Sequence, residues 1–224
     1  MSRGRPWLEV TAVFSLLVAM VWHAGTWLPI SQSAAAALDT VFGLLVAAIV
    51  LVAWWRARVG FRALGLAPSQ WRSGWESIAL FTTAGTIALL ALGAALGSAS
   101  FAAARIAWLL DYAPGIAAQQ LLLQGFFAPR IGTLFAARPA RSQRIATVAL
   151  ASAAFVALHT PNPALMGGVA VAGAFWTWHF LLHRNLLAVL ASHLVLGATA
   201  MAALGPGPML NLRVGPGALE LLLR

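Results

Sequence analysis

Long stretches of the chain carry no charged side chain, and this feature limits the possible folds more than any other. The residues from Leu186 to Leu204 form one such stretch, and those from Ser77 to Gly97 form another. A helix needs about 20 apolar residues to cross the hydrocarbon core of a bilayer. The 224 residues are 61% hydrophobic and only 8% charged, whereas soluble domains are about 25% charged. The sequence therefore predicts an integral membrane protein and excludes a soluble globular domain.

Helices are favoured over a β-barrel. Inside a bilayer the backbone must satisfy its own polar groups, which leaves helices or closed barrels. Barrel strands are about 10 residues long and alternate in polarity, but the apolar runs here are longer, continuous and rich in Ala and Leu. We expect an all-α, polytopic transmembrane helix bundle of about seven spans, forming a single membrane domain over residues 1–224. The expected spans are Leu8–Ile30, Leu38–Trp55, Glu76–Gly97, Ala107–Phe127, Ile145–His159, Ala164–His183 and Leu186–Leu204.

Two segments leave alternatives open. The first apolar run follows Arg3 and Arg5 and is longer than the apolar core of a signal peptide, which is about 7–15 residues. A retained helix is therefore favoured over a cleaved signal. The stretch from Arg56 to Trp75 mixes arginines and tryptophans with apolar residues. It is either a short amphipathic segment at the membrane surface or an ordinary loop.

Arginines cluster at the ends of the apolar runs. The chain has 14 basic residues, all of them Arg, against five acids. Cytoplasmic loops carry an excess of basic residues, and placing the amino terminus inside puts most arginines there. That set is Arg3, Arg5, Arg56, Arg58, Arg62, Arg72, Arg130, Arg138, Arg141, Arg144 and Arg184, and only Arg105, Arg213 and Arg224 fall outside.

The arginines also indicate the partners of the chain. At the ends of spans they are expected to contact lipid headgroups, so membrane lipid is the expected partner. No base-stacking or zinc motif supports nucleic-acid binding. The composition is rich in Ala and Arg and free of Lys, which is typical of a high-GC bacterium. We therefore expect a bacterial cytoplasmic membrane protein with its amino terminus inside.

No metal and no cofactor is expected. The chain has no cysteine, which excludes disulfides, thiol nucleophiles and thiolate metal sites. His179 and His183 have a spacing that can hold a metal, but they lie near a helix end without a carboxylate nearby. We interpret them as interfacial side chains.

A few polar side chains lie inside the expected spans, and each is a candidate functional residue because its burial in lipid is costly. Gln120 and Gln124 share a helix face, and Gln119 lies about 100° around the helix from Gln120. Three glutamines alone are more typical of hydrogen bonds between helices. His193 lies well inside the last span and needs partners for both ring nitrogens, which the glutamines could supply. Ser192 points about 100° away from His193, so we expect it to bond its own helix backbone.

Three segments in this order resemble the CPBP family of intramembrane proteases, also called the Abi or type II CAAX prenyl endopeptidase family. That family carries a Glu-Glu-x-x-x-Arg motif, then Phe-x-x-x-His, then His-x-x-x-Asn on successive helices. The resemblance covers about residues 113–197. The corresponding segments here are Gln119-Gln120-Leu-Leu-Leu-Gln124, Phe155-Val-Ala-Leu-His159 with the following Thr-Pro-Asn162-Pro, and His193-Leu-Val-Leu-Gly197.

The resemblance implies water-mediated hydrolysis of an amide bond within the membrane. In the family, the glutamate pair and one histidine activate a water, and the second histidine and the asparagine stabilise the oxyanion. The implied substrate is a membrane-associated or lipidated peptide. The implied catalytic positions are Gln119, Gln120, His159 and His193, and the implied supporting positions are Gln124, Phe155, Asn162 and Gly197.

The first motif is degenerate, because glutamines occupy both glutamate positions and the arginine position. An amide cannot take up a proton at neutral pH, and general-base catalysis contributes about 10²–10⁴-fold. Without the carboxylates a buried guanidinium would lack its partners. The absence of the arginine is therefore consistent with the absence of both glutamates.

Two hypotheses follow. The chain is an endopeptidase in which His159 or His193 is the base, or it is a catalytically inactive pseudoprotease that binds membrane peptides or partners through the same Gln/His pocket. A small transporter or channel subunit is less favoured, because it would require carboxylates or paired charges inside the spans. At 1.5 Å per residue, His159 falls near the outer edge and Gln120 near the middle of the bilayer. These side chains meet only if the expected boundaries shift by a turn or two.

Overall fold

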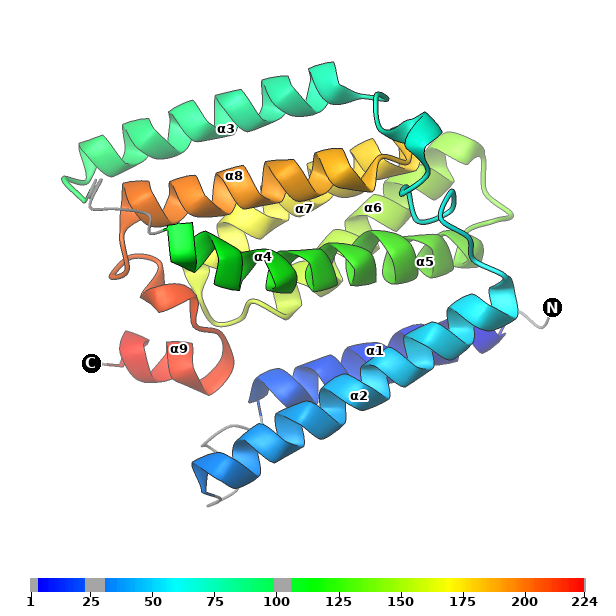
Figure 1. Ribbon diagram of the computed structural model, residues 1–224, viewed down its shortest axis with the longest axis horizontal. Coiled ribbons are helices and arrows are strands. Elements are labelled where there is room, and N and C mark those ends of the chain that lie inside the picture. The colour runs from blue at the N-terminus through cyan, green and yellow to red at the C-terminus, as the bar shows by residue number, and fades with distance from the viewer. Residues whose placement is uncertain (1–3, 23–30, 99–105, 224) are drawn as a thin grey trace.

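The structure is a computed structural model that describes residues 4–22, 31–98 and 106–223. Within these ranges every regular element is a helix and no strand occurs, so the predicted all-α class is confirmed (Figure 1). The longer helices are α1 (Gly4–Trp22), α2 (Gln32–Ala57), α3 (Trp75–Ala95), α4 (Ile106–Gln120), α6 (Ala140–Ala157), α7 (Pro163–His183) and α8 (Leu186–Leu204). The shorter elements are η1 (Pro68–Gln70), η2 (Leu121–Phe127), α5 (Ala128–Leu134), η3 (Leu210–Leu212) and α9 (Gly215–Leu222).

Four of the described helices, α2, α3, α7 and α8, are long and apolar enough to cross a membrane. Helix α1 is apolar but shorter, and the end of the predicted first span, residues 23–30, lies outside the described residues. Helix α6 begins with Arg141 and Arg144 near its start, which shortens its apolar part. The described residues thus give an apolar helical bundle with four candidate spans, and the expected number of seven is not confirmed.

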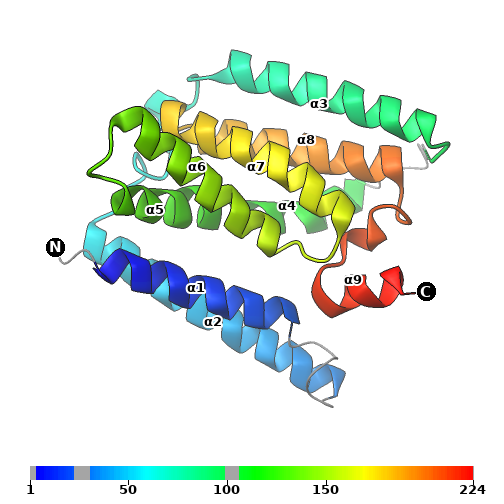
Figure 2. The same cartoon turned by 180° about the vertical axis from the view of Figure 1, so that it is seen from behind.

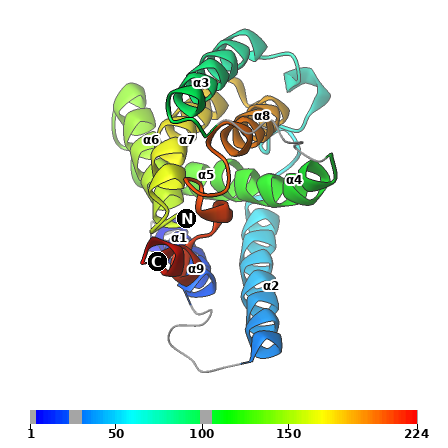
Figure 3. The same cartoon turned by 90° about the vertical axis from the view of Figure 1, so that its left-hand side faces the viewer.

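The helices pack in pairs. Helix α3 packs on α8, α6 on α7, and α4 on α8, whereas α1 packs on α2 and also contacts α5 and α9. The α1–α2 pair lies to one side of the other helices (Figure 2), and α2 stands apart from α3 and α8 when viewed from the end (Figure 3). Gly93 is required in the α3–α8 contact, because a Cβ there would collide with the backbone carbonyl of Ala203.

One continuous helical stretch runs from Ile106 to Leu134 through α4, η2 and α5 (Figure 1). The sequence predicted that the fourth span ends at Phe127 and that Arg130 lies in a cytoplasmic loop. The predicted loop was wrong, because Arg130 lies within α5 and is only 8% exposed. Its Nε donates to Glu9 Oε2 of α1 at 2.8 Å. This carboxylate from a neighbouring helix compensates the charge of the buried arginine.

The middle of this stretch, η2, is a π-helix that the sequence did not predict. A π-helical turn departs from the regular hydrogen-bond ladder of an α-helix. The indole Nε1 of Trp54 in α2 donates to the carbonyl of Gly125 in η2 at 3.0 Å. A Cβ at Gly125 would lie 3.0 Å from Leu64 and 3.2 Å from Trp54. Glycine therefore permits this close approach.

The segment between α2 and α3 consists of turns and the single 3-10 turn η1, so it forms a loop. Several hydrogen bonds attach it to the end of α7 and the start of α8. Asn185 Nδ2 donates to the carbonyls of Trp71 and Ser73. His179 Nε2 donates to the carbonyl of Gly74, and His183 Nδ1 lies 3.2 Å from Ser73 Oγ. The two histidines therefore fix this loop.

Candidate active site

A cavity of about 320 Å³ lies between α1, the α4–η2 stretch, α6, α7 and α8. Most of its lining is apolar, with Leu17, Leu123 and Val169 as examples. Its polar side chains are Tyr112, Gln119, His159 and His193. Apolar cavities with a few convergent polar groups are the usual form of a small-ligand site. We call this the histidine cavity; it contains three of the four predicted catalytic positions, and the fourth, Gln120, lies directly behind it.

Gln120 is completely buried and is bonded to His193. Gln124 Nε2 donates to Gln120 Oε1 at 3.1 Å, which directs the NH₂ group of Gln120 towards His193. Gln120 Nε2 lies 2.9 Å from His193 Nδ1. Because the NH₂ group only donates, Nδ1 must be the acceptor and the ring proton resides on Nε2. Gln120 thus fixes the tautomer of His193.

The ring of His193 is also held by two aromatic side chains. It stacks on Trp176 of α7 at 4.4 Å between ring centroids, and it meets Phe155 of α6 edge-on at 6.3 Å. Among the described residues no acceptor bonds to its Nε2. The Nε2–H group is therefore available to a ligand in the cavity.

His159 has the opposite tautomer. Its Nδ1 lies 2.7 Å from the carbonyl oxygen of Phe155. A carbonyl only accepts, so Nδ1 carries the proton and Nε2 keeps its lone pair. The same bond turns the ring back along the end of α6, which explains how a residue beyond the last helical turn reaches the cavity. The two histidines thus present a lone pair and an N–H group to one space.

Gln124 and Asn162 lie away from the cavity wall. Gln124 is completely buried, and its Nε2 also lies 3.4 Å from Thr177 Oγ1 of α7. Its Oε1 has no donor among the described residues. Asn162 caps α7 by accepting from the backbone of Leu165, and its Nδ2 donates to the carbonyls of Met209 and Arg213. Both residues therefore support surrounding elements and do not touch the cavity.

Gly197 provides space for Tyr112. A Cβ at Gly197 would lie 2.5 Å from the hydroxyl oxygen of Tyr112, and this tyrosine lines the cavity. The hydroxyl therefore occupies the position where a larger residue at 197 would place its side chain. The sequence did not single out Tyr112. Its spacing of two helical turns before Gln119 places both residues on one helix face, and this pattern could have identified it.

The expected interaction of Ser192 was wrong. Its Oγ forms a hydrogen bond with Thr82 Oγ1 of α3 at 2.7 Å and accepts one from Trp176 Nε1 of α7 at 2.9 Å. It therefore joins three helices instead of bonding its own backbone. Ser192 is bonded to these partners and not to His193.

Residues 102–199 match the family model described as Type II CAAX prenyl endopeptidase Rce1-like. The resemblance to the CPBP family is confirmed over this segment. The Rce1-like segment contains Tyr112, the three glutamines and both cavity histidines. No curated protein and no solved structure matches the chain. Together with the four apolar helices, the match identifies an integral membrane protein with a CAAX-protease-like segment.

The described lining of the cavity contains no Asp or Glu. Among the described residues, no three His, Asp or Glu side chains gather in a way that could hold a metal ion. In the Rce1-like segment, the groups in this cavity that can accept a proton from water at neutral pH are therefore the imidazoles. The arrangement combines one imidazole lone pair with an N–H donor, an amide and a phenol.

Proposed function

We propose that the histidine cavity is the active site of an intramembrane endopeptidase in which His159 acts as the base. The observation that supports this role is the pair of opposite tautomers, because His159 offers a lone pair and His193 offers an N–H group to the same cavity. Hydrolysis of an amide needs both functions, a base for the attacking water and a donor for the oxyanion.

The proposed reaction proceeds in two steps. His159 Nε2 takes a proton from water while the water oxygen attacks the carbonyl carbon of the scissile amide. The negative charge that develops on the carbonyl oxygen accepts a hydrogen bond from His193 Nε2–H. The tetrahedral intermediate then loses the amine as the C–N bond breaks, and the imidazolium of His159 protonates the leaving nitrogen. Gln120 acts as a positioning residue, because it keeps the proton of His193 on Nε2.

The proposed substrate is a membrane-associated or lipidated peptide. The cavity wall is mainly aliphatic and aromatic, and its volume of about 320 Å³ is small, at the low end of the range for ligand sites. An apolar side chain or part of a lipid tail fits this lining, and the amide of Gln119 and the hydroxyl of Tyr112 can bond a peptide backbone. A single imidazole replaces the glutamate pair that activates water in the family, so we expect slow turnover.

A second candidate function is peptide binding without hydrolysis. It is favoured by the lack of any carboxylate in the described lining and by the hydrogen-bond chain of uncharged groups from Gln124 through Gln120 to His193. These hydrogen bonds hold the side chains in place without an ionised group, which is sufficient for a site that only binds its ligand. In this case the protein is a pseudoprotease that holds a membrane peptide.

Two measurements separate these candidates. The purified protein in detergent is tested for cleavage and for binding of one set of lipidated, internally quenched peptides. We expect slow cleavage by the wild type, and a loss of about 10²-fold or more in both His159→Gln and His193→Gln. His183→Gln is the matched control, because His183 bonds the loop before α3 and lies outside the cavity lining. Its rate should equal that of the wild type.

Three outcomes change the assignment. Binding without cleavage in the wild type, with cleavage gained in the triple variant Gln119→Glu, Gln120→Glu and Gln124→Arg, supports the pseudoprotease. Cleavage that is unchanged in both histidine variants contradicts the proposed mechanism. Neither binding nor cleavage by a protein that is helical by circular dichroism contradicts both candidates.

We also propose a bacterial cytoplasmic membrane with the amino terminus inside, supported by the excess of arginines at one end of the spans. The lack of native cysteine allows a direct test with single cysteines. Ser142→Cys near the start of α6 should react with a membrane-impermeant maleimide only after the membrane is opened. Gly207→Cys, after α8, should react in intact cells. The reverse pattern would contradict this orientation.

A further inference from the structure

A second cavity, of about 1110 Å³, lies at the other end of α1 from the histidine cavity. It is lined by the start of α1 at Pro6 and Glu9, whereas the histidine cavity contacts α1 at Leu17 and Val21. The remaining lining comes from the end of α2 and the loop after it, from Gly125 of η2, from α5 and from the turn between α7 and α8. We call it the arginine cavity, because the charged groups of its described lining are one carboxylate, Glu9, and four guanidiniums, those of Arg56, Arg58, Arg130 and Arg184.

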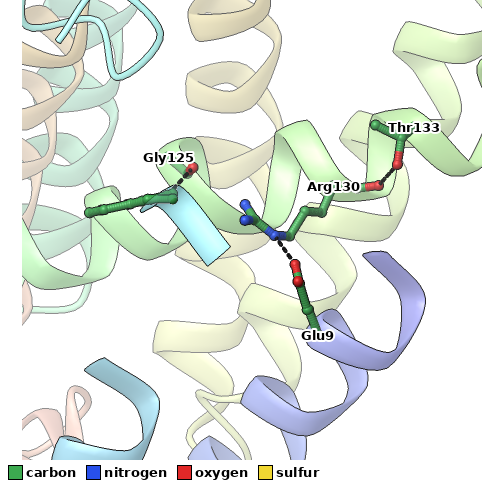
Figure 4. A network of polar contacts seen from close by, with 5 residues as sticks. Glu9, Gly125, Arg130 and Thr133 are labelled. Atoms are coloured by element: carbon green, nitrogen blue, oxygen red, sulfur yellow. Dashed lines mark hydrogen bonds and ion pairs between the residues drawn. The ribbon is translucent and has the colours of Figure 1, made fainter. Parts of the chain in front are cut away.

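Arg130 is fixed in the wall of this cavity. Its Nε donates to Glu9 Oε2 at 2.8 Å, and its guanidinium carbon lies 4.2 Å from the ring centre of Phe126. Its two terminal nitrogens make no hydrogen bond to another described residue, and they lie on the side away from the carboxylate (Figure 4). A guanidinium held in this way is preorganised for an oxyanion, because its planar fork matches phosphate and carboxylate geometry.

Arg58 and Arg184 reach the cavity from unusual backbone positions. Both end a helix in the left-handed region, with φ values of 51° and 48°. Glycine or asparagine is the usual residue at such a position, because a larger side chain is strained there. Two arginines at two strained helix ends, both lining one cavity, indicate a binding role for their charge. Neither forms an ion pair with another described residue.

The surroundings of the cavity favour a lipid over a soluble anion. Leu51 and Trp55 of α2 line it and are 59% and 79% exposed. Helix α2 is one of the four candidate spans, so this exposed face lies against acyl chains. Tryptophan is enriched at the level of the headgroups, and basic pockets between transmembrane helices bind anionic headgroups.

We propose that the arginine cavity binds one anionic phospholipid. Its headgroup phosphate lies between Arg130 and the arginines at the ends of α2 and α7, and its acyl chains lie along Leu51 and Trp55. This site is separate from the histidine cavity and does not depend on its chemistry. The lipid joins α1, α2, α5 and the α7–α8 turn on the arginine-rich side.

Native mass spectrometry of the full chain in neutral detergent, titrated with phosphatidylglycerol or phosphatidylcholine, tests this proposal. We expect one phosphatidylglycerol to bind in preference to phosphatidylcholine. The variant Arg56→Gln, Arg58→Asn, Arg184→Asn should lose this preference by about tenfold or more, since each arginine near an anionic headgroup contributes measurably. Asparagine suits the left-handed positions, and Arg130 is kept because it pairs with Glu9.

The matched control removes the same charge elsewhere. Arg62, Arg72 and Arg141 are exposed and lie outside the cavity lining, so the triple glutamine variant at these positions should keep the wild-type preference. Replacing Arg56, Arg58 and Arg184 by lysine should retain most of it.

Four results would overturn the site. They are an unchanged preference in the cavity variant, an equal loss in the control variant, equal binding of both lipids by the wild type, and displacement of the lipid by millimolar inorganic phosphate, which would indicate a soluble anion. If the cavity variant does not fold, the lipid preferences of the lysine variant and of the wild type decide the question.

Discussion

The two cavities of this protein flank the same π-helical segment, η2, but hold their polar groups in opposite ways. The histidine cavity is lined by Leu122, Leu123 and Phe127 of η2, and the polar groups of its described lining are all neutral. The arginine cavity is lined by Gly125 of the same segment and by four arginines. The polar groups of the histidine cavity are therefore neutral, with His159 bonded to a backbone carbonyl and His193 to the buried Gln120, whereas the arginine cavity has most of its charges at the ends of α2 and α7.

Solvation explains this difference. Transfer of an ionised group into a medium of low dielectric constant is costly unless the group is paired. Neutral amides and imidazoles escape this cost when their hydrogen bonds are complete. Gln120 meets that condition through Gln124 and His193, whereas Arg130 is buried with a carboxylate partner. The replacement of charged motif residues by glutamine is thus compatible with a well-packed interior.

The largest expected effect concerns the hydrogen bonds that join Gln124, Gln120 and His193, and it shows whether they are needed for stability. Gln120→Met removes the acceptor for Gln124 and the donor for His193, and each unpaired buried group costs about 1–3 kcal/mol. We expect a loss of about 2–5 kcal/mol in the free energy of unfolding, measured by denaturant titration in detergent.

Gln119→Met is the matched control for this change. Gln119 is next in sequence, only partly buried, and without a hydrogen bond to another described residue. Its effect should stay within about 0.5 kcal/mol. Equal losses in the two variants would show that Gln120 is not held as described.

The second prediction concerns the ion pair between Glu9 and Arg130 in the wall of the arginine cavity. Glu9→Gln leaves the Arg130 guanidinium without a counter-charge in a site where it is 8% exposed. Because the pair is partly open to solvent, we expect a loss of about 1–3 kcal/mol, below the value for a fully buried pair. The double variant Glu9→Gln, Arg130→Gln should lose less than the sum of the single variants. Strict additivity would mean that the two charges do not interact.

The smallest effect concerns the segment between the cavities. Trp54→Phe keeps the aromatic contact with Gly125 but removes the indole donor to its carbonyl, so we expect a loss of about 1 kcal/mol. Trp55→Phe, at a residue that is 79% exposed, should change stability by less than about 0.5 kcal/mol. Faster amide exchange in η2 for Trp54→Phe alone would show that this bond stabilises the π-helix.

Several features of the candidate site could be predicted from the sequence, because they depend on spacing along one helix. Gln120 and Gln124 bond to each other as a pair four residues apart, and His193 found the glutamine partner that a buried imidazole requires. The role of Asn162 could not be predicted. Its amide bonds the carbonyls of Met209 and Arg213, which are remote in sequence and come close only through the path of the chain after α8.

The sequence by itself determined the class of this protein, because long uncharged runs can satisfy their backbone in lipid only as helices. It also determined the order of the CAAX-protease-like motifs. Tertiary structure alone decided which polar groups meet. Helix α1 brings Glu9 to Arg130, the turn after α6 directs His159 back into the cavity, and η2 separates a neutral cavity from a charged one. Such contacts depend on how helices lie against one another, and the periodicity of a single helix contains no information about its neighbours.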